Sequence, residues 1–157
     1  MLHGMPTSED VETVERVIPA PPEKIFDLLA DPRRHRDLDG SGSVGDAKES
    51  PDRLSLGAEF GMSMKIGISY TMVNEVIEFE ENRRIAWQPR PASKLGALIG
   101  GGRIWRYELE PVDGGTQVRE SWDISQERLP KWMMRPARNR TRDAMEKTLA
   151  RIEELVT

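Results

Sequence analysis

The closing stretch of the chain changes its hydrophobic period, and this change constrains the fold more than any other feature. Upstream, apolar side chains alternate with polar ones, as at Trp105, Tyr107 and Leu109. A period of two is typical of half-buried strands. From Thr141 to Val156 the apolar residues are instead three or four positions apart, which is the spacing of an amphipathic helix. We therefore expect one long C-terminal helix to lay its apolar stripe on the apolar face of a sheet.

Alternating or β-rich segments predict about six strands, and two short helical patterns follow the first of them. The predicted strands cover 11–18, 58–66, 69–80, 83–88, 105–110 and 117–124. The pattern "EKIFDLLA" predicts a helix that ends at Asp31, because a residue before proline avoids helical angles. A second short helix is predicted over 33–38, and "DGSGSVG" is interpreted as a turn. Val76 and Ile77 together break the alternation and indicate a bulge.

Length and composition indicate one domain. The 157 residues include 37% hydrophobic ones, enough for one substantial core over 11–157, with residues 1–10 as a flexible lead-in. The formal charge of −4 disfavours nucleic acid as a partner. Zero cysteines exclude disulfides, thiolate catalysis and cysteine-bound zinc, and two histidines make a metal site improbable. No metal or other cofactor is predicted.

No basic start is followed by an apolar run, so neither a signal peptide nor a membrane span is predicted. We expect a cytoplasmic protein without stable membrane insertion, although transient membrane contact is compatible with the sequence. A monomer and a homodimer are both compatible with it.

One acidic residue stands in an apolar row. In "TQVRESWDI" alternation places Val118, Trp122 and Ile124 on one face, and Glu120 shares that face. An inward carboxylate is costly unless it is paired or a cavity admits water. Two interpretations stay open: a solvated or ion-paired glutamate, with an arginine such as Arg103 or Arg106 as partner, or a functional carboxyl.

The order of these elements resembles the START-like, Bet v 1-like superfamily, and especially its bacterial polyketide cyclase/dehydrase and lipid-transport branch. The stretches that carry the resemblance are "VERVIPAPPEKIFDLLADPRRHRDLDGSGSV", "VNEVIEFEENRRIAW", "RIWRYELEPVDGGTQVRESWD" and the closing helix. The resemblance implies an α+β helix-grip fold. In this fold a curved antiparallel sheet of about six to seven strands wraps around the long C-terminal helix, and two short helices follow the first strand.

The resemblance also implies a hollow between sheet and helix that binds an apolar small molecule. We expect a cavity of several hundred cubic ångströms, the usual size of ligand sites. Methionine suits varied apolar guests, and Asn74 belongs to the set if it shares the parity of Val76. The expected lining residues are Met62, Met64, Tyr70, Asn74, Trp87, Trp105, Tyr107, Trp122, Met145 and Leu149.

Two segments are candidates for a gate. The connection "QPRPASKLGALIGGG" combines proline and glycine with apolar side chains that a plain solvent loop would not need. We expect 88–102 to be a mobile lid. The stretch 128–142 holds six basic residues and no acidic one, interleaved with apolar side chains. It suits either a cavity entrance or contact with a lipid interface. The expected gate residues are Leu95, Leu98, Ile99, Trp132 and Met133.

His35 and three functional classes complete the expectations. His35 lies among Arg33, Arg34 and Arg36, so we interpret it as a surface residue, with a proton carrier as the alternative. The first class is a binder or carrier of a lipid-like or polyketide-like molecule. The second is a cofactor-free cyclase or dehydratase with Glu120 as acid or base. The third is a protein-interaction module of the co-chaperone type. The sequence does not decide whether the protein is an enzyme.

Overall fold

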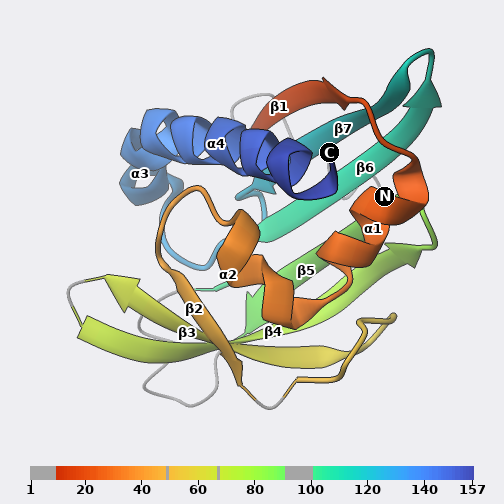
Figure 1. The fold of residues 1–157 in the computed structure, drawn as a ribbon. Coiled ribbons are helices and arrows are strands. Elements are labelled where there is room, and N and C mark those ends of the chain that lie inside the picture. The colour runs from red at the N-terminus through yellow and green to blue at the C-terminus, as the bar shows by residue number, and fades with distance from the viewer. Residues whose placement is uncertain (1–9, 49, 67, 91–100) are drawn as a thin grey trace, which may run out of the picture.

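The computed structural model describes residues 10–48, 50–66, 68–90 and 101–157. Figure 1 shows a single sheet with the helices gathered on one of its faces. In chain order the elements are β1 (Val11–Ile18), α1 (Pro22–Leu29), the 3-10 helix η1 (Pro32–Arg34), α2 (His35–Leu38), β2 (Val44–Lys48), β3 (Glu59–Ile66), β4 (Ile68–Glu80), β5 (Arg84–Arg90), β6 (Ile104–Val112), β7 (Gly115–Asp123), α3 (Lys131–Met134), the 3-10 helix η3 (Arg135–Ala137) and α4 (Arg138–Val156).

The sheet has seven antiparallel strands in the order β1-β7-β6-β5-β4-β3-β2. Each strand from β2 to β7 pairs with its neighbour in sequence, and β1 joins the sheet beside β7. The long helix α4 packs on β1 and β7, and it also contacts α1 and α2 (Figure 1). The predicted helix-grip architecture, with two short helices after the first strand, is therefore confirmed.

β2 was not predicted as a strand. Residues 39–45 were interpreted as a glycine and serine turn, but Val44–Lys48 pairs with β3 at the edge of the sheet. Its sequence VGDAK has no apolar alternation. The pairing with β3 therefore defines this strand, and the strand's own pattern does not. The bulge predicted at Val76 is present as a shift of register between Val76 and Glu78 where β4 pairs with β5.

The core lies between the sheet and the helices. α1 starts with Pro22, which suits the first helical position, and its apolar side presents Phe26 and Leu29 to the sheet. α4 presents Met145, Leu149 and Ile152, which are buried as its stripe predicted. Burying one such side chain is worth roughly 1.5 to 3 kcal/mol. These two helices therefore hold the inner face of the sheet away from water.

Gly40 brings the turn after α2 close to α4. Its backbone N–H donates to Oγ1 of Thr148 at 2.9 Å. A Cβ at position 40 would lie 2.2 Å from the carbonyl oxygen of Ala144. The turn can pack this closely on α4 only because residue 40 has no side chain.

Within the ranges that the structure describes, no helix is long and apolar enough to cross a membrane.

Candidate functional site

Glu120 and Tyr107 form a buried pair on two adjacent strands of the sheet. They are directly opposite each other on β7 and β6, so both side chains point to the face that carries the helices. The phenol hydroxyl of Tyr107 donates to Oε2 of Glu120 at 2.9 Å. Each residue is only 3% exposed. The carboxyl thus lies inside the protein, as the parity of "TQVRESWDI" predicted.

The second oxygen of Glu120 has no partner. Oε1 is enclosed and makes no hydrogen bond with any described residue. Burial raises the pKa of Glu120 to about 8, the hydrogen bond from Tyr107 opposes this shift, and the charge of Asp39 adds to it. Burial also holds the pKa of Tyr107 well above its usual value, and the adjacent Glu120 adds to this effect. At neutral pH the Glu120 carboxyl is therefore mostly protonated, and its oxygen Oε1 is left to donate or accept a hydrogen bond.

The arginines proposed as partners of Glu120 are elsewhere. Nε of Arg103 lies 3.1 Å from Oε2 of Glu127, and NH2 of Arg106 lies 2.6 Å from Oε2 of Glu78. Glu120 forms no ion pair within the described part of the chain, so the ion-paired alternative is wrong. An uncharged tyrosine, and not a cation, faces this carboxyl.

Three tryptophans form a row across the sheet beside this pair. Trp87, Trp105 and Trp122 are register partners on β5, β6 and β7. The ring centroids of Trp105 and Trp122 are 6.5 Å apart, and Trp87 lies 5.5 Å from Tyr107. Trp87 and Trp122 are buried, whereas Trp105 is partly exposed. The row therefore extends from the surroundings of the buried Glu120 pair to Trp105, which is in contact with solvent.

The surface interpretation of His35 is wrong. The side chain is 5% exposed, and its ring stacks on Trp87 at 4.7 Å between centroids. It also meets the edge of Phe60, and Nε2 lies 2.8 Å from the carbonyl oxygen of Leu29. Burial lowers the pKa of His35, although the bond to Leu29 opposes the shift. The adjacent arginines suggested exposure, but helix α2 turns this one residue toward the sheet.

The other predicted lining residues are distributed over the inner face. Asn74 and Met62 are buried on β4 and β3, and Met145 and Leu149 are buried on α4. Met62, Met145 and Leu149 belong to the same apolar cluster as Tyr107 and Trp122. Met64 and Tyr70 are paired between β3 and β4, and their side chains lie outside what the structure describes.

The predicted gate is only partly covered by the structure. Leu95, Leu98 and Ile99 lie outside the described residues. Trp132 and Met133 are at the surface of α3, with 72% and 48% exposure.

The sequence analysis missed the role of Glu127. Its buried carboxylate accepts from the backbone N–H of Gly101 at 2.7 Å and from Nε of Arg103 at 3.1 Å. It therefore fixes the chain where β6 begins. Its neighbours in "SQERLP" are irregular and carry no periodic signal that could have pointed to it.

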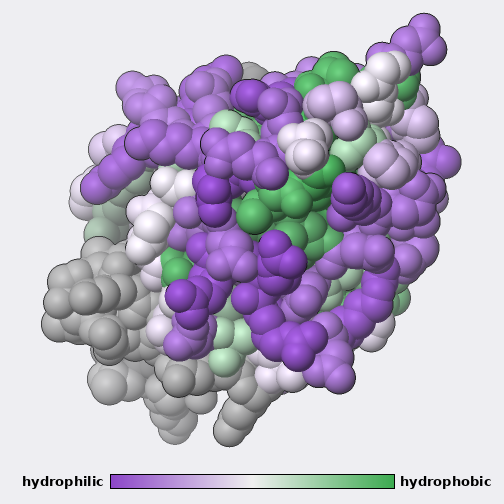
Figure 2. Space-filling view, in the orientation of Figure 1, coloured by the Kyte–Doolittle hydropathy of each residue, from purple (hydrophilic) through white to green (hydrophobic). Residues whose placement is uncertain are grey.

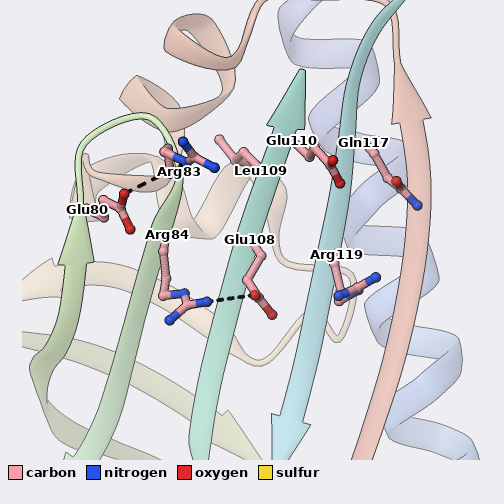
Figure 3. A pocket seen from close by; sticks show the side chains of 8 residues that line it. All are labelled: Glu80, Arg83, Arg84, Glu108, Leu109, Glu110, Gln117 and Arg119. Atoms are coloured by element: carbon pink, nitrogen blue, oxygen red, sulfur yellow. Dashed lines mark hydrogen bonds and ion pairs between the residues drawn. The ribbon is translucent and has the colours of Figure 1, made fainter. Parts of the chain in front are cut away.

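A pocket of about 310 Å³ lies on the other side of the molecule from the Glu120 pair. Figure 3 shows its side chains on β4, β5, β6, β7 and the turn between β4 and β5. Arg84 on β5 and Glu108 on β6 are bonded at 3.0 Å. Its lining is mostly charged, which does not suit an apolar ligand. The expected cavity between the sheet and α4 stays a prediction. The residues that line this outer pocket are Glu80, Arg83, Arg84, Glu108, Leu109, Glu110, Gln117 and Arg119.

Comparison with known proteins identifies relatives over nearly the whole chain. The profile of the family described as "Polyketide cyclase / dehydrase and lipid transport" matches residues 11–157. The uncharacterized protein Rv0088 of Mycobacterium tuberculosis is 34% identical over 108 residues, which cover 68% of this chain and 44% of that protein. The chain thus spans less than half the length of the curated relatives that it matches.

Solved structures share the fold at low sequence identity. Protein NE0264 of Nitrosomonas europaea superposes with a TM-score of 0.72 at 18% identity and covers 94% of each chain. A protein of Arthrobacter aurescens superposes with a TM-score of 0.72 at 14% identity, covering 98% of this chain and 89% of that chain. These similarities agree with the observed sheet and helix arrangement.

Proposed function

Because the chain belongs to the polyketide cyclase/dehydrase and lipid transport family, we propose that it binds an apolar small molecule between the sheet and α4. The Glu120 carboxyl is the polar group that orients this molecule. The proposal covers binding or carriage of a lipid-like or polyketide-like compound, as ligand sites in proteins usually combine an apolar lining with a few polar groups.

The single observation that carries the proposal is the enclosed oxygen Oε1 of Glu120. A buried polar atom without a hydrogen bond costs about 1 to 3 kcal/mol. A ligand carbonyl that accepts from the protonated carboxyl would recover this cost. Tyr107 holds the other oxygen at 2.9 Å and thereby fixes the direction of the free one.

The surroundings of this oxygen favour an apolar and partly aromatic ligand. Met145 and Leu149 cover the sheet from α4, and Trp122 and Trp87 flank the pair on the sheet itself. Aromatic faces stack on flat apolar molecules, and methionine adapts to their shape. A ligand with one carbonyl on an apolar frame fits this chemistry.

A second candidate function, catalysis, is favoured by the same pair. Acid–base chemistry needs titratable groups within hydrogen-bond reach of each other, and Tyr107 with Glu120 meets this condition. A carboxyl with a pKa of about 8 can protonate a ligand carbonyl near neutral pH. This role corresponds to enolisation or dehydration of a polyketide-like substrate without a cofactor.

The proposal predicts a ligand that depends on Glu120. Native mass spectrometry of protein purified from its own host is expected to reveal a bound apolar compound, and a solvatochromic dye should compete with it. Glu120→Leu removes every polar group of this side chain and should weaken carbonyl-bearing ligands by about tenfold, since a hydrogen bond to a buried group is worth roughly 1 to 2 kcal/mol.

The matched control is Glu110→Gln on β6, which removes an exposed carboxylate. It should leave dye binding unchanged. Equal dye binding by the wild type, Glu120→Leu and Tyr107→Phe would contradict the role of the pair. Ligand turnover that stops in Glu120→Gln while binding persists would select the enzyme over the carrier.

A further inference from the structure

The short helix α3 exposes two large apolar side chains next to each other. Trp132 is 72% exposed and Met133 is 48% exposed, whereas the following Met134 is buried in the core. Met134 thus anchors the helix and leaves its two neighbours outside. Large exposed apolar groups that are adjacent mark contact sites more often than single ones do.

The same part of the chain is strongly basic. Residues 128–142 hold six Lys or Arg and no acidic residue, in a chain whose formal charge is −4. Among the described residues, carboxylates lie within ion-pair distance of some of these cations: Asp10 beside Lys131 and Arg135, Glu12 beside Arg138 and Arg142, and Glu146 beside Arg142. The stretch itself carries six positive charges.

The positive charges are on the outside of this region. The carboxylates of Asp10, just before β1, and of Glu12, on β1, are buried, while the cations above them are partly exposed to solvent. Arg128 and Arg140 are exposed and have no side-chain ion pair with any residue that the structure describes. An approaching surface therefore meets the cations first.

The fold gathers these groups at one end of the molecule. α3 lies beside the start of α4 (Figure 1), where the helix N-terminus adds partial positive charge. Figure 2 shows hydrophilic residues over this end of α4. Four cations, Arg128, Lys131, Arg135 and Arg140, are close to Trp132 and Met133 in sequence. We call these six residues the basic face.

We propose that the basic face docks on an anionic lipid surface. Arginine and lysine are attracted to anionic headgroups, and a tryptophan beside them favours the level between headgroup and acyl chain. Since the rest of the chain carries a net negative charge, this attraction also orients the molecule with α3 toward the membrane. Docking in this way does not require the proposed apolar ligand.

Flotation with lipid vesicles tests the proposal. The wild type is expected to bind vesicles of phosphatidylcholine mixed with phosphatidylglycerol, to ignore vesicles of phosphatidylcholine alone, and to dissociate as salt is raised. Its tryptophan emission should shift to the blue, because the exposed Trp132 enters the interface. No binding to the anionic vesicles would overturn the proposal.

Two sets of variants test the apolar and the electrostatic contributions to vesicle binding separately. Trp132→Ala should lower vesicle binding about tenfold or more through the lost apolar contact, and should abolish the spectral shift. Arg128→Gln combined with Arg140→Gln should lower binding about fivefold for each charge. All three side chains are exposed, so the variants should keep the thermal stability of the wild type.

Matched controls change the same groups elsewhere. Leu56→Ala removes an apolar side chain that is 65% exposed in the loop between β2 and β3. Arg33→Gln with Arg83→Gln removes two exposed cations outside the basic face. Binding lost equally in these controls would overturn the proposal. So would binding of double-stranded DNA or heparin that matches vesicle binding and is unaffected by Trp132→Ala, since that pattern indicates a general polyanion partner.

Discussion

Glu120 occupies a position that favours its neutral form. It lies on the inner face of a seven-stranded sheet, on the strand next to the edge strand β1, and the group that contacts it is the hydroxyl of Tyr107 and not a cation. A charged carboxylate there has one hydrogen bond and little water. The protein therefore keeps a protonated carboxyl group in its interior, whereas a carboxylate in a structural salt bridge would be charged.

Stability should fall as the pH rises from about 4.5 to 8 because of Glu120. Its pKa is raised from 4.5 to about 8 in the folded state, so the folded protein binds more protons than the unfolded chain in this window. Each pKa unit is worth about 1.4 kcal/mol. Glu120→Gln should flatten this slope and stabilise the protein by a few kcal/mol near pH 9, as measured by urea unfolding. An unchanged slope in the variant would contradict the raised pKa.

His35 should produce the opposite slope in acid. Burial lowers its pKa below the ordinary 6.5, so the unfolded chain gains a proton first and the folded protein loses stability as the pH falls below about 6.5. His35→Gln should remove this loss. It should also cost roughly 1 to 3 kcal/mol at neutral pH, because the stacking on Trp87 and the packing against Phe60 disappear. Urea unfolding at several pH values measures both effects.

The direction and burial of a single side chain could be predicted only where the pattern of its own strand was sufficient. Alternation in β7 alone predicted correctly that Glu120 points inward. Its partner Tyr107 was not predicted as such, because pairing needs the register between two strands. His35 was misinterpreted for a similar reason, since its local charges are those of an exposed turn, whereas its burial comes from Trp87 and Phe60 far along the chain.

The turn after α2 and helix α4 depend on each other at Gly40. Gly40→Ala should destabilise the protein by roughly 1 to 3 kcal/mol, since the new methyl group must displace the backbone of α4 at Ala144. Gly42→Ala is a useful comparison, because its φ of 74° disfavours a side chain although nothing lies near its Cβ. Thermal unfolding of both variants should show the larger loss for Gly40→Ala. An equal loss of stability would mean that the backbone of α4 at Ala144 shifts easily to make room for the methyl group.

Most elements could be predicted from their own patterns. The period of two indicated β1, β6 and β7, and the helical stripe indicated α4, because each buries one face along its length. β2 has no such face, and its neighbour β3 decides its conformation. Elements that depend on a partner are therefore the ones that a single sequence leaves out.

The first strand and the last helix are held together by Glu12. Its buried carboxylate pairs with Arg138 and Arg142 of α4. Burial alone would raise the pKa of Glu12, but the bonds and charges of the two arginines outweigh it and the pKa is lowered. This contribution to stability is present above about pH 4.5 and is lost as the pH falls through the lowered pKa.

Glu12→Gln should weaken the attachment of α4 to β1. The expected cost is about 1 to 2 kcal/mol at pH 7, because the carboxylate is buried but its two arginines are partly exposed to solvent. Glu15→Gln, which removes an exposed carboxylate from the outer side of the same strand, should cost less than about 1 kcal/mol. Urea unfolding of the two variants compares them, and equal costs would contradict the special position of Glu12.

The overall architecture was accessible from the order of the elements, whereas the interior was not. The order of six alternating segments before one helical stripe resembled a known family, and that resemblance implied the helix-grip arrangement. Whether a hollow remains between Met62 on β3 and Met145 on α4 depends on distances that no single segment determines. The hydrophobic pattern of the sequence therefore predicts which faces of the sheet and helices pack together. The volume left between them depends on the packing of side chains in three dimensions.

The pairing of β1 with β7 has a consequence for how the chain acquires its structure. Thr13 and Ser121 are 108 positions apart in sequence, yet their hydroxyl oxygens are 3.1 Å apart across these strands. On the ribosome β1 must wait without its partner strand until β7 has emerged, and the covering helix α4 follows later still. Contacts between such distant segments slow folding. The apolar face of β1 therefore stays uncovered during most of synthesis, and such exposed surface makes a growing chain prone to aggregate.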